Sequence, residues 1–169
     1  HGNISITAGG GIELNGTAQG TAIRTLDNVT LSAASISEAS NGLIVANNLA
    51  TNTSGNTSLG GPNQISNFSA SAGGDVTLNN TGALNVSNLF ANNATLTNAG
   101  NVTLSGFWNT FGATSIAVAS DLTVNSFVQS NGPMTLDVDG TVRVVGSGLQ
   151  DAQLVSFGGQ TINARALEV

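Results

Sequence analysis

The chain has 169 residues and a net charge of −6, with 7% charged and 4% aromatic residues and no cysteine. Its three basic residues are too few to form the basic surface that nucleic acids and anionic membranes require, so we expect neither as a partner. No segment approaches the roughly 20 apolar residues of a transmembrane helix. Hydrophobic residues still make up 40% of the chain, which favours a folded core over disorder.

Short segments in which aliphatic and polar residues alternate predict β-strands along most of the chain. Each holds only three or four residues, fewer than the strands of a typical β-sandwich. The connections are rich in Gly, Asn and Ser, and Gly and Asn tolerate the conformations of sharp corners. In chain order, the clearest strands are residues 3–6, 11–14, 28–31, 75–78, 83–86, 101–104, 121–124, 133–136 and 141–144.

Related strands recur at two spacings. Eight residues separate Ile4 from Ile12, while Thr103 lies 26 residues after Thr77, and Thr123 follows 20 residues later. An imperfect repeat of this length, with two or three short strands in each unit, is typical of a solenoid. We therefore expect a right-handed parallel β-helix of about seven to eight coils with Gly- and Asn-rich corners, formed by residues 1–169 as a single segment.

Two further features bear on this prediction. Phe68, Phe90, Phe111 and Phe127 follow one another at intervals of 22, 21 and 16 residues, which suggests one ring per coil. The rings form an inward aromatic stack if their register is kept, or scatter if corner insertions shift it. Residues 49–71 interrupt the strand pattern and predict a protruding loop. Both ends of the chain resemble strands, so we expect a piece of a longer repeat protein.

Asp137 and Asp139 form the one tight acidic pair. In a strand both carboxylates face outward while Val138 faces inward. They are weak candidates for a metal site, because the further oxygens of a calcium site are not visible nearby. The alternative is a polar strand edge before the corner at Gly140, and this interpretation is favoured.

Trp108, the only tryptophan, is a candidate ligand contact. Since Phe107 and Trp108 face opposite sides of a strand, one of them is expected at the surface. An exposed Trp108 would stack on a sugar ring or anchor a protein partner, whereas a buried one would pack in the interior. The second placement is favoured.

Catalysis is not expected, and neither is a cofactor. His1 is the only histidine, which argues against a catalytic triad or a histidine metal cluster. A carbohydrate-binding or carbohydrate-active β-helix is the first alternative to a structural role, although the chain has few charges for sugar cleavage. An ice-binding solenoid is a further alternative, suggested by the Thr-x-Thr pairs Thr51–Thr53 and Thr95–Thr97, but such a face needs the motif on every coil.

Residues 49–61, 75–86 and 158–165 together resemble the repeats of filamentous-haemagglutinin-type exoproteins of the two-partner secretion family. The resemblance covers most of the chain and rests on composition and repeat style. It implies a structural or adhesive segment, secreted or held at the bacterial outer surface, which forms a rod or fibre for attachment, biofilm or cell–cell contact. The partners implied are an outer-membrane secretion pore, neighbouring coils or end-to-end copies, and a host glycan or protein receptor. The family's Asn-Pro-Asn motifs are absent, which implies an internal segment.

Overall fold

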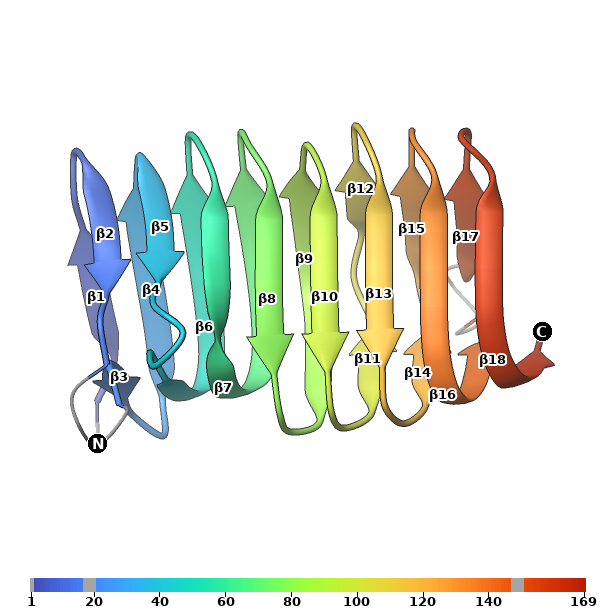
Figure 1. The fold of residues 1–169 in the computed structure, drawn as a ribbon, viewed down its shortest axis with the longest axis horizontal. Coiled ribbons are helices and arrows are strands. Elements are labelled where there is room, and N and C mark those ends of the chain that lie inside the picture. The colour runs from blue at the N-terminus through green and yellow to red at the C-terminus, as the bar shows by residue number, and fades with distance from the viewer. Residues whose placement is uncertain (1, 17–20, 147–150) are drawn as a thin grey trace.

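The computed structural model describes residues 2–16, 21–146 and 151–169; His1 lies outside these ranges. The described residues form eighteen strands and no helix, and every strand pairing is parallel (Figure 1). The coils lie side by side along one axis, with the two chain termini at opposite ends. None of the described residues forms a helix long and apolar enough to cross a membrane.

The strands stack into three faces, and the longer strands turn a corner and contribute to more than one face. The first face contains β1 (Ile4–Thr7), β4 (Asn28–Ala33), β6 (Ile44–Thr53), β7 (Thr57–Ala72), β9 (Leu84–Ala91), β12 (Trp108–Thr110), β15 (Phe127–Ser130) and β17 (Gln153–Ser156). The second face contains β2 (Gly11–Leu14), β5 (Ser35–Glu38), β7, β8 (Val76–Asn80), β10 (Ala94–Asn98), β13 (Thr114–Val118), β16 (Met134–Val144) and β18 (Gln160–Glu168). The third face contains β3 (Ile23–Arg24), β11 (Val102–Leu104) and β14 (Leu122–Val124), together with parts of β6, β7, β9, β16 and β18.

This arrangement confirms the predicted β-solenoid. Its parallel strands are stacked in successive turns along one axis. The strands pair in register because the same inward position of each coil carries an aliphatic residue. On the second face this row is fully buried and consists of Leu59, Leu78, Leu96, Ile116 and Leu136. Burying each such side chain contributes roughly 1.5–3 kcal/mol, and a slip of one residue would turn the whole row outward.

The prediction of a protruding loop at residues 49–71 is wrong. Most of these residues belong to β6 and β7, and Leu49 and Phe68 are core residues. The segment looked irregular because threonines occupy inward positions that aliphatic residues fill elsewhere. Thr53 and Thr57 are both buried, and their hydroxyl oxygens lie 3.0 Å apart in a hydrogen bond. A buried hydroxyl is tolerated where it has such a partner.

Phe68, Phe90, Phe111 and Phe127 take the scattered one of the two arrangements that the sequence left open. Phe68 faces the core, but Phe90 is 40% exposed and Phe111, beyond the end of β12, is 67% exposed. The rings that do touch lie on the outside, where the centroid of Phe107 is 5.5 Å from that of the tilted ring of Phe90 and 5.7 Å from that of the stacked ring of Phe127. Corners of unequal length shift the register between coils, so equal spacing in sequence does not give equal positions in space.

Close stacking of the corners leaves no room for a side chain at some glycines. A Cβ atom built on Gly106 would overlap the carbonyl oxygen of Ser87 on the preceding coil, whereas a Cβ on Gly82 meets no atom within 4 Å. We expect Gly106→Ala to lower the free energy of unfolding by about 1–3 kcal/mol, since the backbone must shift to relieve the overlap. Gly82→Ala is the control and is expected to change it by less than about 0.5 kcal/mol. Urea unfolding followed by circular dichroism measures both, and equal midpoints would contradict this account.

Candidate functional site

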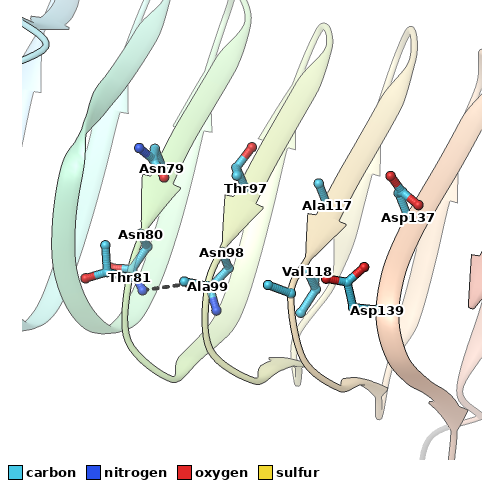
Figure 2. Close-up of a pocket in the computed structure, with 11 residues that line it drawn as sticks. Asn79, Asn80, Thr81, Thr97, Asn98, Ala99, Ala117, Val118, Asp137 and Asp139 are labelled. Atoms are coloured by element: carbon cyan, nitrogen blue, oxygen red, sulfur yellow. Dashed lines mark hydrogen bonds between the residues drawn. The ribbon is translucent and has the colours of Figure 1, made fainter. Parts of the chain in front are cut away.

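A shallow groove of about 300 Å³ crosses the second face where β8, β10, β13 and β16 approach a corner (Figure 2). Its surface side chains follow one another from coil to coil, while the buried side chains of Asn80, Asn98 and Val118 lie beneath it. The surface side chains are Asn79, Thr81, Thr97, Ala99, Ala117, Ala119, Asp137 and Asp139.

The groove follows from the register of the strands. Asn79 pairs with Thr97, Thr97 with Ala117, and Ala117 with Asp137. Successive strands lie about 4.8 Å apart, so three steps extend over roughly 14 Å along the axis. The short side chain of Ala117 lies between the longer ones of Thr97 and Asp137, and the surface is therefore hollowed at this coil.

Asp137 and Asp139 lie together at the β16 end of the groove. Both are exposed and Val138 between them is buried, as the alternation predicts. Neither forms an ion pair with a described basic residue. The described residues include no group of three or more potential metal ligands around them. Two carboxylates alone fall short of the six to eight oxygens that calcium takes.

Arg143, on the neighbouring part of β16, is already engaged by other carboxylates. Its Nη1 lies 3.2 Å from Asp121 Oδ2 and its Nε lies 2.8 Å from Glu168 Oε2. The backbone amide of Thr141 donates to Asp121, and together with the Arg143 guanidinium it lowers the pKa of that carboxyl below its usual range. Arg143 therefore pairs with Asp121 and Glu168, and neither carboxylate of the groove forms an ion pair with it.

Trp108 takes the buried of the two placements left open by the sequence. It is 1% exposed, and its Nε1 donates to Thr114 Oγ1 at 3.3 Å inside the core. Phe107 is the exposed neighbour, at 39%. Trp108 therefore offers no ring to a ligand at the surface and plays no part in the groove.

The floor of the groove rests on a ladder of buried amides that the strand pattern did not reveal. Asn80 Oδ1 accepts from the amide of Ile65 at 2.8 Å, and its Nδ2 donates to Asn98 Oδ1 at 2.9 Å. Asn63 continues the ladder, with its Oδ1 accepting from the amide of Ile44 and its Nδ2 donating to Glu38 Oε2. The sequence carries one signal of this ladder, because an asparagine ends each of the strands β8 and β10. The structure pairs these two residues, Asn80 and Asn98, in register.

Next to the groove, an unbroken row of hydroxyl side chains runs along the second face. Neighbours in this row are paired residues of consecutive coils, and the row consists of Ser37, Ser58, Thr77, Thr95, Ser115, Thr135 and Thr161. Of the two Thr-x-Thr pairs, Thr95 and Thr97 are exposed, but Thr51 and Thr53 are buried. The row that contains Thr97 is not a second continuous row of hydroxyl groups, because Asn79, Ala117 and Asp137 occupy the equivalent positions on the neighbouring coils.

Comparison with known proteins gave no match to a family model, to a curated protein or to a solved structure.

Proposed function

We propose that the chain is a structural and adhesive segment of a bacterial cell-surface or secreted exoprotein, a rigid rod that holds cells to a surface or to one another. The observation that carries this proposal is the uncharged, hydroxyl-rich row on the second face, which repeats one kind of contact on consecutive coils. Repeated weak contacts on a rigid support act together, so a surface can be held firmly without any deep pocket.

A set of hydrogen-bonded asparagine side chains outside the core supports the same function. Asn28 Nδ2 donates to Asn3 Oδ1 at 2.9 Å, and Asn48 Nδ2 donates to Asn28 Oδ1 at 2.6 Å. Asn85 and Asn67 are joined in the same way at 3.2 Å. These hydrogen bonds between identical side chains join three pairs of neighbouring coils, and such bonds suit a rod that must resist bending and pulling.

Attachment of beads that carry the folded chain tests this proposal. Purified chain is coupled to fluorescent beads, which are counted after washing on cultured host cells and on glass. The control is the same chain coupled after heat unfolding, which keeps the composition and removes the ladders. We expect roughly tenfold more folded-chain beads to remain, because many weak contacts act together. We also expect an excess of soluble folded chain to release the beads. Equal retention of the two kinds of bead would overturn the adhesive function.

A further inference from the structure

We propose that the groove on the second face binds a neutral glycan chain that lies along the axis of the solenoid. This inference rests on the proposed adhesive function and names the ligand that one part of the surface would hold. It is carried by the shape of the groove, by the chemistry of its lining and by the rigidity of its floor.

The shape suits an extended chain. The groove crosses four consecutive strands, β8, β10, β13 and β16, over roughly 14 Å, and it is an open hollow rather than an enclosed cavity. Its lining positions repeat at the coil spacing, with Asn79, Thr97, Ala117 and Asp137 in one row, as Figure 2 shows. A polymer with a regular repeat can meet such a row with one unit after another, whereas a compact ligand would use only part of it.

The lining offers partners both for the hydroxyl groups of a sugar ring and for its apolar C–H face. Asp137 and Asp139 supply carboxylate oxygens, which are strong acceptors for hydroxyl donors. Asn79 and Thr97 add amide and hydroxyl groups at the other side of the groove. Between them, the methyl group of Ala117 provides an apolar contact against which the C–H face of a ring can pack.

The charge of the groove selects among glycans. Its two carboxylates are the charged groups in its lining, and the whole chain carries only three basic residues against nine acidic ones. An anionic polysaccharide would bring like charges together without a cation to offset them. A neutral glycan has no such cost, and its hydroxyl groups at the β16 end of the groove can donate to the two carboxylates.

The floor is fixed before any ligand arrives. Asn80 and Asn98, directly beneath the lining, are at most 2% exposed and hydrogen-bonded to each other and to the backbone. The strands above are held in parallel register on both sides. Binding therefore orders few protein groups, which lowers the entropic cost that weak sugar contacts must overcome.

The test measures binding of neutral hexasaccharides to the purified chain by calorimetry and by ligand-observed NMR. The probes are cellohexaose, N-acetylated chitohexaose and mannohexaose, with an oligogalacturonate as the anionic probe and a glucosamine hexamer as the cationic one. We expect at least one neutral probe to bind, and the anionic probe not to bind. Ala117→Gln fills the groove without changing the charge and is expected to weaken binding roughly tenfold. The double variant Asp137→Asn and Asp139→Asn is expected to weaken it by a similar factor, because it removes charge-assisted hydrogen bonds.

Ala50→Gln is the matched control. Ala50 is half-buried like Ala117, but it belongs to β6 on the first face, away from both the groove and the hydroxyl row. This variant is expected to bind the probe within about twofold of the unchanged chain. All variants should share the circular dichroism spectrum and the urea midpoint of the unchanged chain. Binding by no neutral probe, tighter binding of the cationic or anionic probe, or equal weakening by Ala50→Gln would each overturn the inference. Beads carrying the Ala117→Gln chain separate the two proposals, because attachment that persists without glycan binding leaves the adhesive function standing.

Discussion

Replacing Trp108 by alanine is expected to lower the free energy of unfolding by about 3–5 kcal/mol. Its side chain is the largest of the fully buried ones, packed in the core where β12 pairs with β9 and β15. Truncation leaves a cavity that the coils above and below cannot close, because their spacing is set by backbone hydrogen bonds. Truncation also removes the Nε1–H group that donates a hydrogen bond to Thr114 Oγ1. Urea unfolding followed by circular dichroism gives the change.

Phe107→Ala is the matched control, since Phe107 precedes Trp108 in sequence and faces outward. Its ring touches those of Phe90 and Phe127, and aromatic pairs at the surface contribute about 0.5–1.5 kcal/mol. We expect the Phe107 variant to lose no more than that. A loss equal to that of the Trp108 variant would show that the outward stack, rather than the core, holds these coils together.

The fold could be predicted because its main signal is local. Alternation around Val76, Leu78, Leu84 and Val86 marks which side chains face inward, and all four are core residues of β8 and β9. The recurrence of such segments then implies stacking, since a single coil cannot bury its own apolar face. The pair Asp137 and Asp139 was placed on one outward face by the same reasoning.

The parts that could not be predicted depend on how neighbouring coils align. The position of Phe90 relative to Phe107 follows from the pairing of β9 with β12, in which Leu89 lies opposite Trp108 and Phe90 opposite Asn109. The groove depends on the coincidence of Ala117 with Thr97 and Asp137, residues 20 positions apart in sequence. Since those pairings come from three-dimensional register, no motif in the sequence marks the groove.

Polar residues at inward positions were the hardest to interpret, because the alternation rule treats Asn as a surface or corner residue. Asn63, Asn80 and Asn98 are all at most 2% exposed. Each amide can donate and accept at the same time, which allows a row of them to satisfy one another and the backbone at a corner where strand pairing ends. The buried carboxylate of Glu38 lies at one end of this row and accepts from Gly61 and Asn63.

Asn80→Ala is therefore expected to cost about 2–5 kcal/mol, an effect much larger than for an ordinary asparagine. It leaves the amide of Ile65 without its acceptor and Asn98 Oδ1 without its donor, and each buried group left unpaired costs about 1–3 kcal/mol. The control is Asn79→Ala, one residue earlier and facing outward, where the side chain makes only a 3.4 Å hydrogen bond to Gly60. That variant is expected to lose less than about 0.5 kcal/mol.

A third variant separates hydrogen bonding from shape. Asn80→Asp keeps the volume of the side chain and the acceptor for Ile65, but it puts a carboxylate oxygen where Nδ2 donates to Asn98. If hydrogen bonding holds the corner, Asn80→Asp should destabilise the rod at least as much as Asn80→Ala at neutral pH, because a buried charge then faces an acceptor. If filling the space is what matters, the aspartate variant should unfold close to the unchanged chain. The urea midpoints of the three variants decide between these accounts. A midpoint of Asn80→Asp close to that of the unchanged chain would mean that the amide ladder stabilises the rod by filling space rather than by hydrogen bonding.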